Sequence, residues 1–131
     1  MRIRHIAIVT QDLERTAAFY EKVFGFRRLG GVRKPGHFPG MALDLTDGEV
    51  NYSLLRPRDD IPVREWSQGG LGPNHVGVEI EDTDRVVAAL HELGVEIYGA
   101  EHADPPRFFK FRDLDGVEID VATPDRGWRV G

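Results

Sequence analysis

One pattern is written twice along this chain. The segment "RIRHIAIVTQDLERTAAFYEKVFGF" near the start is matched by "PNHVGVEIEDTDRVVAALHELGVEI" in the second half. In each copy a His is followed by a small residue, then an Asp and then an Arg, at the same spacing. These positions are His5, Ala7, Asp12 and Arg15 in the first copy, and His75, Gly77, Asp82 and Arg85 in the second. A repeat of this kind restricts the fold to architectures built from two copies of one supersecondary unit.

Hydrophobic periodicity gives each copy the order strand, helix, strand, strand, strand. In the first copy, residues 3–9 alternate as a strand does, and the run from Asp12 to Gly25 has a helical period with a capping residue at each end. The other predicted elements are strands around 26–30, 41–45 and 50–55, then a strand over 75–80, a helix over 83–93, and strands near 95–99, 108–112 and 117–122. The sequence therefore predicts an α+β fold of tandem βαβββ modules, with the helices on the outer face.

The module boundaries follow from the repeat and from composition. We predict a first module over 1–57, a connector over 58–71, a second module over 72–124 and a C-terminal tail over 125–131. The connector is polar and rich in Gly and Pro, which is typical of a linker or a lid.

Charge and cysteine content exclude several classes of partner. The chain has 131 residues, with 22 acidic against 17 basic side chains and a formal charge of −5. A nucleic-acid or membrane-surface binder would show a basic excess, so we expect no nucleic acid and no membrane, and a small molecule as the partner. There are no cysteines, which leaves His and carboxylates as the strong metal ligands. With no long apolar stretch, a cytoplasmic protein is expected.

Strand alternation predicts that the two repeated histidines share a face. Ile6 and Ile8 take the helix side of the first strand, so His5 lies on the opposite, concave side. His75 takes the same place in the second module. The small residue two places after each His is expected to leave open space for a ligand.

The last strand of each module adds acidic and polar groups to this face. Counting back from the prolines at 57 and 124 aligns Ser53 with Asp120 and Asn51 with Glu118. Two neutral imidazoles and one carboxylate form a ligand set for one divalent ion, of the Fe, Mn, Ni or Zn type. Such a set leaves coordination positions for substrate and water. A packing role alone does not require His twice at equivalent positions.

The sequence has the βαβββ tandem, the opening "RIRHIAIVTQDLERTAAFYEKVFGF", the start of the second module, "NHVGVEIED", and the end of that module, "FRDLDGVEIDV". In these features it resembles the vicinal oxygen chelate superfamily. The superfamily includes glyoxalase I, methylmalonyl-CoA epimerase, extradiol dioxygenases and fosfomycin or bleomycin resistance proteins. The resemblance covers residues 1 to about 124. It implies eight strands in a cupped mixed sheet around a metal, often completed in a homodimer, so a homodimer is expected.

The resemblance also implies roles for single residues. His5 and His75 match the two metal histidines, and Asp120, four residues after Gly116, stands where the family usually has a Glu ligand. Asp is one methylene shorter, so Glu118 on the same strand face is the alternative ligand. Glyoxalases and epimerases take a further Glu or Gln ligand from the end of the first module. Ser53 stands there, which disfavours ordinary glyoxalase chemistry.

Other side chains receive candidate roles in catalysis or substrate binding. An acid or base role suits His37 in its loop, whereas Tyr52 is predicted to be core. Arg33 in its loop, and Arg107 with Lys110, are candidates to clamp an anionic substrate. The candidate catalytic residues are His37, Ser53 and Glu118, and the candidate substrate-binding residues are Asn51, Arg33 and Arg107.

Two classes of function follow. The first is a metal-dependent enzyme acting on a small oxygenated metabolite chelated by the ion, with dioxygenase-like or lyase/isomerase-like chemistry. The second is a protein that binds or sequesters a small molecule without turnover, as bleomycin resistance proteins do.

Overall fold

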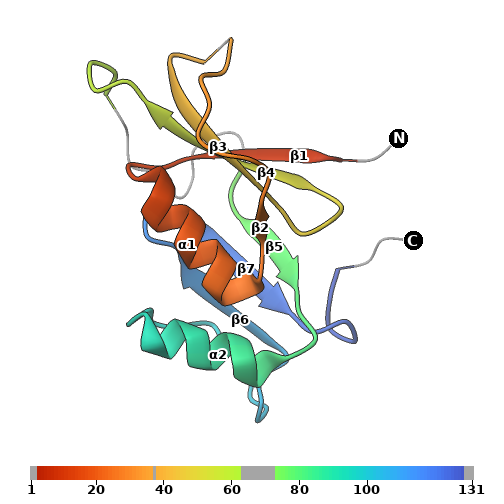
Figure 1. Ribbon diagram of the computed structural model, residues 1–131. Coiled ribbons are helices and arrows are strands. Elements are labelled where there is room, and N and C mark those ends of the chain that lie inside the picture. The colour runs from red at the N-terminus through yellow and green to blue at the C-terminus, as the bar shows by residue number, and fades with distance from the viewer. Residues whose placement is uncertain (1–2, 37, 63–72, 129–131) are drawn as a thin grey trace. The chain divides into compact units, whose positions relative to one another are not determined.

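A computed structural model describes residues 3–36, 38–62 and 73–128 (Figure 1). The chain divides into two compact units, Met1–Arg64 and Glu65–Gly131, each described by itself. His37, the candidate acid or base, and residues 63–71 of the predicted connector lie outside the described residues. No helix in the described part of the chain has the length and apolar character needed to cross a membrane.

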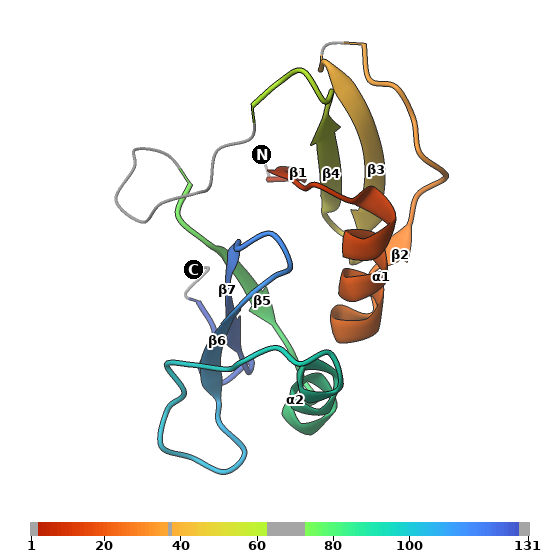
Figure 2. The same cartoon turned by 90° about the vertical axis from the view of Figure 1, so that its left-hand side faces the viewer.

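The first unit is a four-stranded mixed sheet with one helix. Its elements are β1 (His5–Val9), α1 (Leu13–Phe24), β2 (Arg27–Arg28), β3 (Gly40–Thr46) and β4 (Asn51–Pro57). The strand order is β1-β4-β3-β2, with β1 parallel to β4 and the other pairs antiparallel. The helix α1 lies along β3 and β4 on one face of this sheet (Figure 2). The predicted βαβββ order is therefore present in full.

The second unit repeats the parallel pairing of first and last strand. Its elements are β5 (Val76–Glu79), α2 (Thr83–Glu92), β6 (Phe108–Arg112) and β7 (Glu118–Ala122), in the sheet order β5-β7-β6. The strand β5 is parallel to β7, and β6 is antiparallel to it. The α+β fold class with mixed sheets is confirmed.

The strand predicted near 95–99 is reduced to a single β-bridge between Tyr98 and Lys110. Gly94 and Gly99 flank this segment with φ angles of 69° and 61°, in the left-handed region that ends extended pairing. The described residues thus form a four-stranded and a three-stranded sheet, so the expected eight-stranded sheet is met only in part.

The sheet faces follow the predicted alternation in the first unit. Ile8 is buried while His5 and Ala7 are exposed, and Tyr52 is buried with its hydroxyl donating to the Tyr20 hydroxyl at 3.1 Å. The predicted core position of Tyr52 is confirmed. Because the helix face is closed by aromatic and aliphatic side chains, the polar side chains of β1 and β4 are left on the other face.

The repeated Asp of the sequence has a local structural cause. Asp12 and Asp82 are the N-caps of α1 and α2, and each side chain accepts a hydrogen bond of 3.0 Å from the backbone N–H three residues later, at Arg15 and Arg85. The repeat therefore preserves helix starts as well as site residues.

Removal of these caps is expected to destabilise each helix to a similar degree. Asp12→Ala and Asp82→Ala should each lower the free energy of unfolding by about 1 kcal/mol, because one backbone donor loses its acceptor. Urea denaturation measures the change. Asp84→Ala in the first turn of α2 removes a charge without removing a cap, and it should cost only a few tenths of that. Equal losses for Asp82→Ala and Asp84→Ala would contradict the capping role.

Candidate functional site

The strand registers give the two units equivalent positions on one face. In the first unit Ala7 pairs with Ser53 across β1 and β4, and in the second Gly77 pairs with Asp120 across β5 and β7. The register agrees with the sequence alignment of Ser53 with Asp120. On the other side of these residues, β3 places Asp44 opposite Ser53, and β6 places Lys110 opposite Asp120. The two units thus carry opposite charges at one equivalent position.

In the second unit, three side chains of metal-ligand type meet. One ligand atom from each of His75, Glu118 and Asp120 lies within 4.8 Å of the others. The Nε2 atom of His75 is 3.5 Å from Oδ2 of Asp120. Glu118 and Asp120 are buried, whereas His75 is exposed. A buried pair of carboxylates needs positive charge nearby, because desolvation penalises each anion.

Lys110 supplies part of that positive charge. Its Nζ atom lies 3.2 Å from Oε1 of Glu118 and 3.2 Å from Oδ1 of Asp120. Burial by itself would lower the pKa of Lys110, but the interactions with Asp120 and Glu118 outweigh it and raise that pKa. The ammonium group therefore stays charged between the two carboxylates.

Glu118 has several donors of its own. The Tyr98 hydroxyl donates to its Oε2 at 2.8 Å, and an Arg112 nitrogen lies 3.7 Å from the same atom. Burial would raise the pKa of Glu118, but the hydrogen bonds from Tyr98 and Lys110 lower it overall. Burial, followed by the neighbouring Glu118, raises the pKa of Tyr98. Glu118 is thus an anion with its oxygens engaged by other side chains.

Asp120 differs from Glu118 in what its oxygens contact. Its Oδ1 atom is buried and accepts no hydrogen bond from any residue that the structure describes. The nearby Lys110 ammonium is at ion-pair distance but is not aligned for a hydrogen bond. A buried carboxylate whose Oδ1 accepts no hydrogen bond in the described structure, and whose Oδ2 lies near an imidazole nitrogen, fits a metal ligand. The donor set of His75 and Asp120 is therefore suited to a divalent ion.

Both histidines have their Nδ1 atoms held by an asparagine. His5 Nδ1 lies 2.6 Å from Oδ1 of Asn51, and His75 Nδ1 lies 2.9 Å from Oδ1 of Asn74. An amide oxygen can only accept, so Nδ1 is the donor in each contact, which leaves Nε2 as the nitrogen available to a metal ion. This is the tautomer that a metal-binding histidine needs, with its orientation fixed by the second nitrogen.

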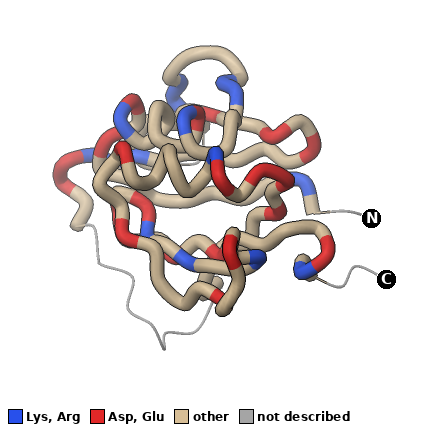
Figure 3. The backbone as a smooth tube through the Cα atoms, turned by 90° about the horizontal axis from the view of Figure 1, so that it is seen from below, with Lys and Arg blue, Asp and Glu red and all other residues tan. Residues whose placement is uncertain are grey.

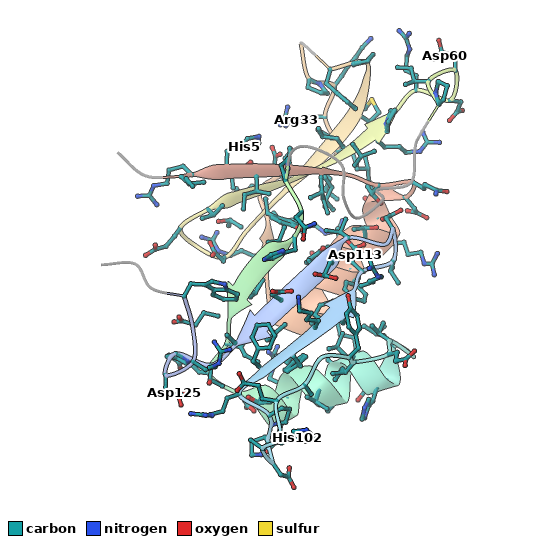
Figure 4. All side chains as sticks on the ribbon, turned by 180° about the vertical axis from the view of Figure 1, so that it is seen from behind. His5, Arg33, Asp60, His102, Asp113 and Asp125 are labelled. Carbon is teal, nitrogen blue, oxygen red and sulfur yellow. The ribbon has the colours of Figure 1, made fainter. Side chains whose placement is uncertain are left out.

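The first unit holds a carboxylate that the sequence reasoning missed. Arg33 donates to Asp44 from Nε at 2.8 Å and from a terminal nitrogen at 3.1 Å, and the Ser53 hydroxyl donates to Asp44 Oδ1 at 2.7 Å. Figure 4 shows Arg33 and His5 on the segments that carry them. The hydrogen bond from Arg33 is the main reason that the pKa of Asp44 is lowered. The sequence signal that points to Asp44 is a single acidic residue within the otherwise apolar run "MALDL".

The other predicted residues have different surroundings. Arg33 is engaged by Asp44, and Arg107 forms an exposed ion pair with Asp125, at 3.0 Å. Lys110, proposed from sequence as a substrate clamp, contacts carboxylates of its own unit. Asn51, a candidate for substrate binding, contacts His5. Basic and acidic residues are both spread over the described chain (Figure 3).

The expectation of open space beside Gly77 is wrong. A Cβ atom added at Gly77 would lie 2.7 Å from the indole ring of Trp128. The ring, from the tail after the second module, takes the volume that a side chain at this position would fill. The glycine is therefore needed for close approach of the indole to β5.

Comparison with known proteins gives the wider relationship. Residues 2–121 match the family model of the Glyoxalase/Bleomycin resistance protein/Dioxygenase superfamily. The mitochondrial methylmalonyl-CoA epimerase of Homo sapiens is 28% identical over 129 residues, covering 92% of this chain and 72% of the epimerase. The ethylmalonyl-CoA/methylmalonyl-CoA epimerase of Cereibacter sphaeroides is 25% identical over 131 residues, covering 92% and 96%.

A solved structure shows the same fold. The fosfomycin resistance protein FosX of Listeria monocytogenes, in a complex with Mn(II), has a TM-score of 0.70 at 17% identity, and the match covers 92% of this chain and 90% of that chain. The family match extends over nearly the whole sequence and includes both strand-helix repeats. The chain belongs to the Glyoxalase/Bleomycin resistance protein/Dioxygenase superfamily.

Proposed function

We propose that the protein is an enzyme that uses one divalent metal ion to act on a small oxygenated metabolite. The observation that carries this proposal is the buried Oδ1 atom of Asp120, which lacks a hydrogen-bond donor in the described structure, on the carboxylate beside the Nε2 atom of His75. Within the second unit, His75 and Asp120 would hold the ion. When bound, the ion would polarise a substrate oxygen and stabilise negative charge developing on it.

The finer proposal is proton transfer at a carbon next to a carbonyl. Support comes from the two relatives above that are named as epimerases, since inversion of a carbon centre next to a carbonyl requires a proton to leave and return. Ser53 counted against such chemistry because it replaces a carboxylate. It donates to Asp44, so the first unit does carry an ionised carboxylate on that face. Glu118, beside His75 and Asp120, is the candidate proton-accepting group of the second unit.

A deuterium-exchange experiment tests the reaction class. The full chain is purified without chelators, its metal content is measured, and it is incubated with methylmalonyl-CoA in D₂O. With Mn²⁺, Co²⁺, Ni²⁺ or Zn²⁺ present, deuterium should enter the carbon between the carbonyls faster than in a protein-free control, and EDTA should abolish the difference. Oxygen uptake with catechols in the presence of Fe²⁺, without exchange, would replace this proposal with ring-cleaving dioxygenation.

One observation favours the second class of function, binding without turnover. The Lys110 ammonium lies 3.2 Å from an oxygen of Glu118 and 3.2 Å from an oxygen of Asp120, so a side chain of the protein already supplies part of the positive charge that the two carboxylates need. Metal content well below one equivalent, with no rise in melting temperature on adding divalent ions, would support a metal-free binding protein.

A further inference from the structure

Lys110 occupies the place where a bound cation would meet Asp120. It stands directly opposite Asp120 in the antiparallel register of β6 and β7. Its ammonium nitrogen is 3.2 Å from the Asp120 oxygen that has no hydrogen-bond donor in the described structure. A divalent ion bound through that oxygen and an ammonium group at this distance would repel each other strongly, because the site is largely buried.

The Lys110 side chain has room to leave. It is 29% exposed, whereas the side chains of Glu118 and Asp120 are each 7% exposed. Its aliphatic stem passes over Gly99, where an added Cβ would lie 3.4 Å from the lysine Cδ. A four-carbon stem supported in this way can move its charged end toward solvent while the strand stays in place.

The two carboxylates cannot move in the same way, because they are buried and their side chains are shorter than that of lysine. Without a compensating cation, two buried anions on neighbouring positions of one strand face would destabilise the folded unit. Lys110 supplies that compensation, and a divalent ion would supply the same charge more strongly. The ammonium and the ion are therefore alternatives at one position.

We propose that Lys110 competes with the metal ion for Asp120. In the metal-free protein its charge stabilises the folded unit against repulsion between the two buried carboxylates. Lys110 thereby lowers the affinity for the ion, and its ammonium group is displaced when the ion binds. This inference rests on the proposed metal assignment to His75 and Asp120. The proposal predicts that the metal binds reversibly and that the Lys110 ammonium group becomes more exposed to solvent when the ion binds.

The wild-type chain itself provides a direct test. It contains three lysines, Lys22, Lys34 and Lys110, and the first two are exposed. Reductive methylation followed by mass spectrometry should label Lys110 slowly in the metal-free protein and severalfold faster with saturating Mn²⁺. Lys22 and Lys34 should label at the same rate in both conditions. Unchanged or slower labelling of Lys110 while Mn²⁺ binds would overturn the inference.

A pair of variants gives the affinity. Lys110→Met keeps an apolar stem and removes the charge, so Mn²⁺ alone should bind about tenfold more tightly by calorimetry, with a larger Mn²⁺-induced rise in melting temperature. Arg112→Met is the matched control, since Arg112 is 43% exposed and ion-pairs with Glu118 at 3.7 Å. Its Mn²⁺ affinity should stay within about threefold of wild type. If the metal-free Lys110→Met protein does not fold, refolding it with Mn²⁺ should recover it.

The outcomes separate this inference from the proposed function. Equal Mn²⁺ affinity for wild type and Lys110→Met, together with unchanged labelling, removes the competitor role and leaves the metal centre intact. Weak binding by wild type and tight binding by Lys110→Met supports the competitor role even if no turnover is found. Absence of Mn²⁺ binding by both proteins overturns the competitor role and the metal assignment together.

Discussion

Asp120→Asn is expected to abolish saturable divalent-metal binding. The substitution keeps the shape of the side chain but removes the anionic ligand beside His75, so the remaining donors are too few to hold the ion firmly at neutral pH. We expect the affinity for Mn²⁺ or Zn²⁺ to fall by about 100-fold or more. Calorimetric titration of the chelator-treated protein measures this, and the metal-induced rise in melting temperature should disappear with it.

Glu118→Gln is the matched control for this result. Glu118 lies on the same strand face, but its oxygens already accept hydrogen bonds from the Tyr98 hydroxyl and the Lys110 ammonium. Loss of its charge removes an interaction near the ion rather than a ligand, so binding should persist with an affinity about 10–100-fold weaker at most. If Glu118→Gln loses the metal and Asp120→Asn keeps it, the ligand assignment moves to Glu118.

Phe111→Ala is expected to have the largest effect on stability while leaving the metal affinity nearly unchanged. Phe111 is fully buried on β6, paired with Ile119 of β7, and it stands between Lys110 and Arg112 on the opposite face of the strand. Removing a buried aromatic ring loses its transfer free energy and leaves a cavity, at a cost of about 3–5 kcal/mol. Chemical denaturation measures the loss.

A second variant, Leu93→Ala, is the control for the stability loss caused by Phe111→Ala. Leu93→Ala removes a side chain that is 38% exposed in the same unit and should cost well under half as much as Phe111→Ala. The Mn²⁺ affinity of the folded Phe111→Ala protein should lie within a few fold of wild type. A loss of metal binding as large as that of Asp120→Asn would show that the two faces of β6 are not independent.

Local signals in the sequence predicted most of the fold. The N-caps at Asp12 and Asp82 and the alternation around Ile8 depend on neighbouring residues, so they can be read without knowing the tertiary structure. The segment near 95–99 is predicted as a strand, but the structure has only a β-bridge there. Gly94 and Gly99 limit the extended run, and their left-handed conformation is set by the folded chain.

The contacts of the site could be predicted only in part. The shared face of Glu118 and Asp120 follows from strand period, and Asp120 as the ligand stays a prediction. The ion pairs of Arg33 with Asp44, and of Lys110 with both carboxylates, depend on cross-strand register, which turn geometry determines. The position of Trp128 beside Gly77 depends on the path of the tail, for which the repeat gives no second copy to compare.

The equivalent registers of the two units have a consequence for how this chain can diversify. A duplicated ancestor would begin with two identical halves, yet here the same backbone position holds an acid, Asp44, in one half and a base, Lys110, in the other. A chimaera with two copies of the second half would double the ammonium groups and lose Asp44. The two halves are therefore not interchangeable at this position, and each can change its charge there without changing the backbone pairing of the other.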